Sequence, residues 1–353
     1  MALLNVEGIF KTYDSRAISV VDHIDFSVSK NEVISIIGPS GTGKSTVVKI
    51  ISGLVDFEKG KVSFKGKTLV TPDEKNEELL KSISYVPQEL SLDENLTVFE
   101  NIGVNLFEEN EEKRHHLIRD MIEVFGLQYK DEKYPSELST GQKGRVEMAK
   151  ALVTEPELLI LDEPFANLDR SLRNELKEEL LEILKERKIA ALIVTHDLED
   201  AYSYSDKILV LSDGRVKQFS DASEIYFKPV DAWVAKFSGS VNLVAGSVTS
   251  KEGEYFIHEN KLGTFKIKSY DPKIKVGEFA YMLIRPESVA IDESSSLRGK
   301  IKSIAHLGSC YEAVLQIESI LKFRVRVENA QVSSLKKSIK FRIDTEQCQL
   351  LSI

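Results

Sequence analysis

Residues 33–46 read VISIIGPSGTGKST. The first five residues form a short continuous apolar run, which is typical of a strand buried on both faces of a parallel sheet, although a buried helical turn could look the same. The rest fits G-x-x-x-x-G-K-[ST] and leads into the helical run STVVKIISGL, the context that supports a phosphate-binding P-loop (Walker A). Glycines there let backbone amides wrap phosphates, Lys44 supplies a charge, and Ser45 offers a hydroxyl to Mg²⁺. The expected phosphate-binding residues are Gly38, Pro39, Ser40, Gly41, Thr42, Gly43, Lys44, Ser45 and Thr46.

Two further apolar runs end in polar residues, LLILDEP at 158–164 and ALIVTHD at 191–197. Ligands of open parallel sheets lie beyond the carboxyl ends of the strands, so these polar residues and the P-loop should meet at one site. There Asp162 would hold the water shell of Mg²⁺, and Glu163 would accept a proton from the water that attacks the terminal phosphate. Two alternatives stay open: Asp162 as a helix cap, and His196 as a structural histidine.

The two ends of the chain differ in pattern. Helical periodicity is clear at 111–127 and 171–188, where apolar residues share one face. Beyond about residue 240 apolar and polar residues alternate, most clearly in KFRVRVE at 322–328. From 241 to 353 there are 17 Lys and Arg against 13 Asp and Glu, in a chain of formal net charge −9. We therefore expect an α/β domain followed by a small antiparallel β barrel.

Composition excludes several classes of protein. A length of 353 residues rules out one small domain. Two cysteines, Cys310 and Cys348, cannot form a disulfide framework or a four-thiolate metal site. We expect no membrane span, because no apolar run approaches the roughly 18 residues required, and no signal peptide. The negative net charge argues against a general nucleic-acid binder.

Six motifs occur in the order and at the spacings of the ATP-binding subunits of ABC transporters. They are Gly38 to Ser45, Gln88 in SYVPQE, LSTGQ at 138–142, LLILDEP at 158–164 (Walker B), NLD at 167–169 and THD at 195–197. The chain resembles this family over about residues 1–235, which implies an ABC-type P-loop ATPase domain at 1–237 with a helical subdomain at about 89–150. LIRPE at 283–287 and HLGS at 306–309 resemble the regulatory oligonucleotide-fold (TOBE-like) domain of importer ATPases, which implies an OB-like barrel at 238–353.

The resemblance also implies roles for single residues. Tyr13 would stack on adenine, and Gln88 would sense Mg²⁺ and couple the nucleotide to a membrane partner. Glu163 would be the general base, and His196 would position the γ-phosphate and the attacking water. The implied catalytic residues are thus Gln88, Glu163 and His196, and the implied metal contacts are Ser45, Gln88 and Asp162.

The LSTGQ segment is expected to act on a second copy of the chain. By resemblance, Ser139, Gly141 and Gln142 would bind ATP held by that copy, and Asp169 would bridge the two copies. A local alternative is that Ser139 and Gln142 form a capping box that starts a helix. The family usually reads LSGGQ, and Thr140 replaces the first glycine; a β-branched residue resists positive φ and crowds an approaching phosphate.

The implied cofactors are ATP and Mg²⁺, and the implied assembly is a homodimer closed by ATP. Separate transmembrane permease subunits and a solute-binding protein are the implied partners, with no nucleic acid. The expected function is ATP hydrolysis that energises a small-solute importer from the cytoplasmic face of the membrane. Two alternatives stay open: a soluble ABC ATPase acting on nucleic acid or ribosomes, and a nucleotide switch without turnover.

Overall fold

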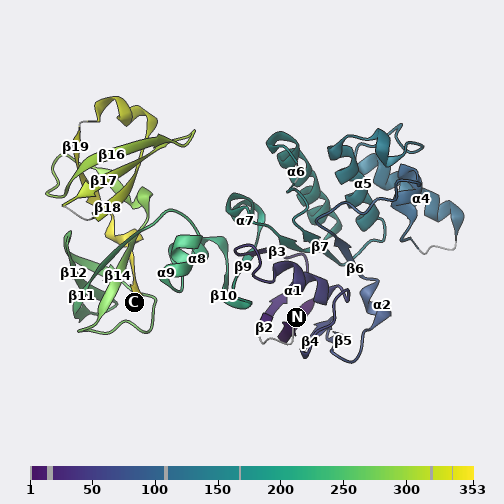
Figure 1. Ribbon diagram of the computed structural model, residues 1–353, viewed down its shortest axis with the longest axis horizontal. Helices are drawn as coiled ribbons and strands as arrows, with labels where there is room; N and C mark the ends of the chain where they lie inside the picture. Colours follow the sequence, from purple (N-terminus) through teal and green to yellow (C-terminus); the bar gives the residue numbers. More distant parts are fainter. Residues whose placement is uncertain (1, 14–18, 107–109, 167, 319–320, 336) are drawn as a thin grey trace. The chain divides into compact units, whose positions relative to one another are not determined.

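The computed structural model describes residues 2–13, 19–106, 110–166, 168–318, 321–335 and 337–353 (Figure 1). The chain forms two compact units, the first ending at Ala222 and the second running from Ser223 to Ile353. No helix within the described ranges has the length and apolar character that crossing a bilayer requires.

A six-stranded, mostly parallel sheet organises the first unit, in the order β10-β9-β3-β8-β7-β6. Its strands are β3 (Val33–Ile37), β6 (Ile83–Val86), β7 (Leu158–Asp162), β8 (Ala190–Val194), β9 (Lys207–Ser212) and β10 (Arg215–Ser220). Every residue of β7 and β8 is buried, as their continuous apolar runs predicted. The parallel pairing of β6, β7, β8, β3 and β9 brings the carboxyl ends of these strands to one edge. The expected α/β fold is confirmed.

A second, antiparallel sheet completes the core of this unit, in the order β2-β1-β4-β5. It consists of β1 (Leu4–Thr12), β2 (Ser19–Val28), β4 (Lys59–Phe64) and β5 (Lys67–Val70). Helix α1 (Lys44–Ile51) contributes four buried side chains to a cluster that contains residues of both sheets: Val47, Val48, Ile50 and Ile51. This packing fixes α1, and with it the loop that precedes α1.

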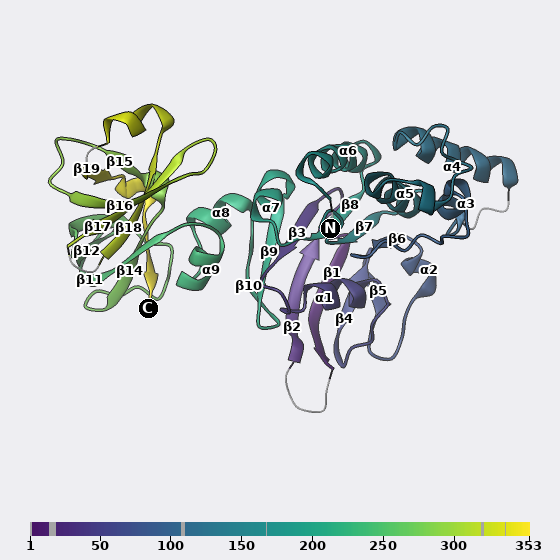
Figure 2. The ribbon, with the colours of Figure 1, turned by 45° about the horizontal axis from the view of Figure 1, so that its top comes forward.

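The region between β6 and β7 is helical. Its elements are α3 (Val98–Gly103), α4 (Glu111–Val124), the 3₁₀ turn η1 (Pro135–Glu137) and α5 (Thr140–Leu152). The short helix α2 (Glu77–Leu80) precedes β6. Figure 2 shows α3, α4 and α5 gathered beside the β6 edge of the sheet, next to α6 (Arg170–Arg187). Helices α4, α5 and α6 share one apolar cluster with β7 and β8, and α7 (Leu198–Tyr204) follows β8.

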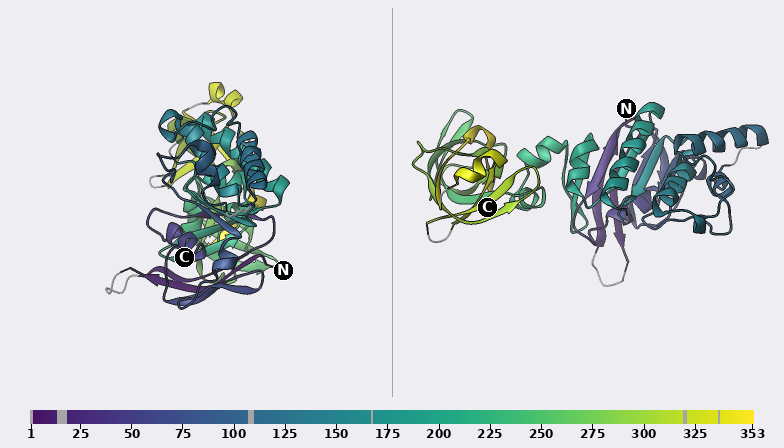
Figure 3. Two further views of the ribbon diagram at one scale, coloured as in Figure 1. Left: turned by 90° about the vertical axis from the view of Figure 1, so that its right-hand side faces the viewer. Right: turned by 90° about the horizontal axis from the view of Figure 1, so that it is seen from above.

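The second unit is built from two five-stranded antiparallel sheets around a common apolar core (Figure 3). One sheet has the order β13-β12-β11-β14-β20, from strands Gly263–Lys268, Tyr255–Asn260, Asn242–Glu252, Phe279–Ile284 and Gln349–Ser352. The other has the order β15-β19-β16-β17-β18, from strands Val289–Ile291, Ser338–Ile343, Arg298–His306, Tyr311–Ile317 and Leu321–Val327. In β18 the alternation is as predicted, with Phe323, Val325 and Val327 buried. The all-β character of this region is confirmed.

The second unit begins earlier than the predicted domain at 238. Helices α8 (Ala222–Phe227) and α9 (Ala232–Phe237) group with the β strands, because Arg285 binds them. The Arg285 side chain is fully buried and donates hydrogen bonds to the carbonyl oxygens of Tyr226 and Ala235. It also donates to the carbonyls of Gly239 and Ser240. A change in charge along the sequence carries no information about the hydrogen bonds of Arg285. The boundary predicted from that change therefore lies after α8 and α9.

Candidate nucleotide-binding site

The P-loop connects β3 to α1, as predicted. Gly41 and Gly43 have φ angles of 79° and 91°, in the left-handed region that favours glycine. A Cβ atom on Gly43 would lie 2.3 Å from the carbonyl oxygen of Val20, which belongs to β2. Only a residue without a side chain fits this turn.

The start of α1 offers donors for an anion. Its N-cap, Gly43, has no side chain, so no side chain caps the amides of the first turn. Lys44 is 6% exposed and its Nζ donates to the carbonyl oxygens of Gly38 and Pro39, both at 2.9 Å. Burial lowers the pKa of Lys44, and the carboxylates of Glu163 and Asp162 act in the opposite direction. A buried ammonium group beside uncapped amides fits a polyphosphate.

Oxygen ligands for a divalent cation lie next to this loop. Ser45 Oγ donates to Asp162 Oδ1 at 2.9 Å, so a hydroxyl and a buried carboxylate lie together, a donor set that suits Mg²⁺. Tyr85 Oη donates to the other oxygen, Asp162 Oδ2, at 3.2 Å. Burial raises the pKa of Tyr85, so its hydroxyl remains a donor at neutral pH. Tyr85 lies within the SYVPQE motif, but the sequence analysis assigned it no role.

Three predicted side chains from three strands meet at Glu163. Gln88 Nε2 donates to Glu163 Oε2 at 3.3 Å, and His196 Nδ1 lies 3.1 Å from the same oxygen. Glu163 itself has a φ of 50°, and its N–H donates to the carbonyl of Val194 at 3.0 Å. The side chain of His196 is 61% exposed and that of Glu163 is 19% exposed. A carboxylate at the solvent boundary, held by two polar neighbours, is able to accept a proton.

Ser139 and Gln142 form the capping box that the local interpretation predicted. Gln142 N–H donates to Ser139 Oγ at 3.3 Å, and Ser139 N–H donates to Gln142 Oε1 at 3.1 Å. Thr140 is the first residue of α5 and has no positive φ, so the expected backbone strain is absent at this residue. Gly141 packs closely against α6, because a Cβ atom there would lie 2.4 Å from Leu172 Cδ2 and the leucine side chain would have to shift.

Asp169 and Tyr13 have local partners. Asp169 Oδ1 caps α6 by accepting from the N–H groups of Ser171 and Leu172, each at 3.1 Å. Tyr13 is 61% exposed, and Lys11 Nζ lies 5.3 Å from its ring centroid. Asn167 of the NLD motif lies outside the described residues.

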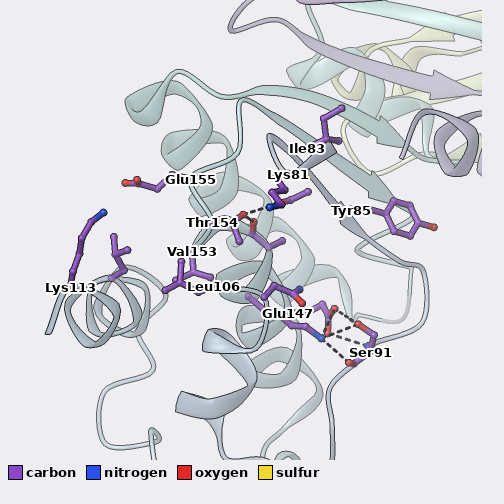
Figure 4. Close-up of a pocket in the computed structure, with 15 residues that line it drawn as sticks. Lys81, Ile83, Tyr85, Ser91, Leu106, Lys113, Glu147, Val153, Thr154 and Glu155 are labelled. Atoms are coloured by element: carbon purple, nitrogen blue, oxygen red, sulfur yellow. Dashed lines mark hydrogen bonds and ion pairs between the residues drawn. The ribbon is translucent and has the colours of Figure 1, made fainter. Parts of the chain in front are cut away.

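The sequence analysis also missed a cleft of about 530 Å³ between β6 and the helices α4 and α5. Figure 4 shows Tyr85, Ser91 and Glu147 among the side chains that line this cleft. Glu147 is 3% exposed although it is ionisable. A carboxylate among the apolar residues of RVEMAKAL, at 145–152, was the signal that could have drawn attention to this place.

Two family models match parts of the chain. The ABC transporter family matches residues 21–166, and the TOBE domain matches residues 282–351. The "Spermidine/putrescine import ATP-binding protein PotA" of Thermotoga maritima is 30% identical over 95% of this chain and 89% of its own length. The chain belongs to the ATP-binding subunits of ABC transporters. These ABC subunits are ATPases coupled to transport.

Two further ABC proteins are similar to the chain. The "Sulfate/thiosulfate import ATP-binding protein CysA" of Bacillus cereus is 31% identical over 82% of this chain and 80% of its own length. A solved ATP-binding cassette, a dimeric post-hydrolysis state bound to ADP and Pi, is 26% identical with a TM-score of 0.55. The match covers 62% of this chain and 98% of that cassette. The resemblance stated from the six motifs is confirmed.

Proposed function

We propose that this chain hydrolyses ATP with Mg²⁺ and thereby energises the import of a small solute through separate membrane-spanning subunits. The observation that carries the proposal is the meeting of Gln88 and His196 at Glu163, beyond the strands that also present the P-loop. The names of PotA and CysA support import. Their cargoes differ while their similarity to this chain is nearly equal, so we assign no cargo.

We further propose how the residues of one chain divide the chemistry. The P-loop amides and Lys44 bind and orient the phosphates of ATP. Ser45, Gln88 and Asp162 hold Mg²⁺, which when bound neutralises charge on the phosphate oxygens. Glu163 takes the proton of the attacking water, while His196 positions that water and the γ-phosphate. Tyr13 stacks on adenine.

Each site needs a second copy of the chain in this proposal. Ser139, Gly141 and Gln142 of one copy contact the γ-phosphate bound by the other copy, and Asp169 bridges the two copies. The start of α5 is suited to this role, because a capped helix N-terminus still presents amides to an anion. The dimeric state of the solved cassette supports such an arrangement. ATP binding then closes the dimer, and hydrolysis opens it.

The other partners follow from the same proposal. The membrane subunits contact the helical region of residues 89–150, and we assign the cleft of Figure 4 to a segment of one of them. A solute-binding protein delivers the cargo on the other side of the membrane. The chain acts at the cytoplasmic face, with no nucleic acid as partner.

The test is the rate of ATP hydrolysis by the purified chain and by Glu163→Gln. The variant should bind ATP but turn over at least about 100-fold more slowly, because a general base typically contributes that much or more. Glu178→Gln, the same change on the exposed face of α6, is the matched control and should keep the wild-type rate. An unchanged rate in Glu163→Gln would remove Glu163 as the base.

The same assay separates the two alternative functions. Wild-type protein that binds ATP without measurable turnover would identify a nucleotide switch. Stimulation of turnover by RNA or ribosomes would identify a soluble ATPase of the other class. Our proposal predicts turnover without either addition.

A further inference from the structure

The segment that follows Gln88 is fastened to the middle of α5. Ser91 N–H donates to Glu147 Oε2 at 3.1 Å, and Ser91 Oγ donates to Glu147 Oε1 at 2.6 Å. Lys150 Nζ donates to the carbonyl oxygen and to Oγ of Ser91, at 2.9 and 3.3 Å. Figure 4 draws these contacts as dashed lines beside Ser91. We call Ser91, Glu147 and Lys150 the Ser91 latch.

The burial of Glu147 makes this connection specific. A buried carboxylate is unfavourable unless hydrogen bonds and a nearby cation compensate it. Glu147 is 3% exposed, and its oxygens receive two hydrogen bonds from Ser91, with Lys150 Nζ 3.9 Å away. If the segment moved away from α5, the carboxylate would lose both Ser91 donors. The latch therefore holds one position strongly.

The two elements that the latch joins each carry a residue that we propose acts on ATP. Ser91 is three residues after Gln88, whose amide donates to Glu163. Glu147 belongs to the helix that begins after Ser139. We propose that the Ser91 latch positions Gln88 against Glu163. This inference rests on the proposed ATPase function and adds the residues that hold Gln88 in place.

All three residues of the latch line the cleft. Tyr85 lines the cleft too, and its hydroxyl donates to Asp162. Tyr85 therefore connects the cleft to Asp162 by a direct hydrogen bond, and Ser91 connects it to Glu163 through the short segment that begins at Gln88.

The first test measures the latch without hydrolysis. Amide hydrogen exchange of residues 88–92 should become at least about fivefold faster in Glu147→Gln and in the milder Ser91→Ala. Glu155→Gln is the matched control, because Glu155 lines the same cleft and has an exposed side chain. Unchanged exchange in both latch variants would overturn the proposal, whatever the chain hydrolyses. If Glu147→Gln fails to fold, Ser91→Ala decides the result.

The second test is a double-mutant cycle on ATP hydrolysis by the full chain. Ser91→Ala should lower kcat by about five- to tenfold and change KM for ATP by less than about twofold, since the P-loop is untouched. In a Gln88→Ala background, Ser91→Ala should have almost no further effect on kcat, because both substitutions act through the Gln88 side chain. Effects that simply multiply would overturn the proposal. A rate of ATP hydrolysis that Glu163→Gln leaves unchanged would instead count against the proposed ATPase mechanism.

Discussion

The hydroxyl of Ser139 has two separable roles, which substitutions can distinguish. Within one chain it caps α5 by accepting from the N–H of Gln142 at 3.3 Å. Replacing a serine N-cap by alanine costs about 1 kcal/mol, whereas glycine costs only a few tenths. Ser139→Ala should therefore lower the unfolding free energy of the first unit by about 1 kcal/mol, or its Tm by about 2–4 °C for a unit of this size. Ser139→Gly should unfold close to wild type.

The Ser139 variants should rank differently in ATP-driven dimerisation than in stability. Ser139→Ala and Ser139→Gly both lack the hydroxyl proposed to contact ATP across the dimer, so both should bind ATP normally and stay monomeric with it. Ser139→Thr keeps a hydroxyl and a competent cap, and should still dimerise. Sedimentation velocity with and without Mg-ATP, in a Glu163→Gln background that preserves ATP, measures this. A Ser139→Gly chain that dimerised as fully as its Glu163→Gln parent would show that no site is shared through this hydroxyl.

Three further predictions concern the P-loop and the second unit. Lys44→Ala should abolish detectable binding of a fluorescent ATP analogue, because it removes the charge that faces the phosphates; retained binding would contradict this. Gly43→Ala should weaken ATP binding in calorimetry by at least about tenfold, since its Cβ atom would lie 2.3 Å from Val20 O; wild-type affinity would show that the loop can shift. Arg285→Met should destabilise the second unit by about 3 kcal/mol by leaving carbonyls unpaired. The single tryptophan, Trp233 in α9, reports that transition by fluorescence, and an unchanged midpoint would refute it.

The strands around the site were predictable because their sequences are strongly constrained. A strand buried on both faces must be apolar throughout, and parallel strands end at one edge of the sheet. Those two rules place Glu163 and His196 together although they are 33 residues apart, and the structure puts them 3.1 Å apart. The antiparallel sheet of β1, β2, β4 and β5 escaped prediction, since its strands are only partly buried and alternate irregularly.

Contacts of side chains to which the motifs assign no role were not predictable. Tyr85 reaches Asp162 only because β6 pairs with β7 in a register that sets Tyr85 beside Ile160. Ser91 and Glu147 are 56 residues apart, and nothing local announces their contact. The capping box was the opposite case, since its two residues lie within one turn and their spacing is sufficient.

The hydrogen bonds from Arg285 to α8 and α9 limit where the second unit of this chain could be exchanged during evolution. A crossover at residue 238 would join a foreign pair of helices to this guanidinium and replace the segments that supply the Tyr226 and Ala235 carbonyls. A crossover upstream of Ser223 would carry the arginine and its acceptors together. Swapped C-terminal modules should therefore be inherited with their two leading helices.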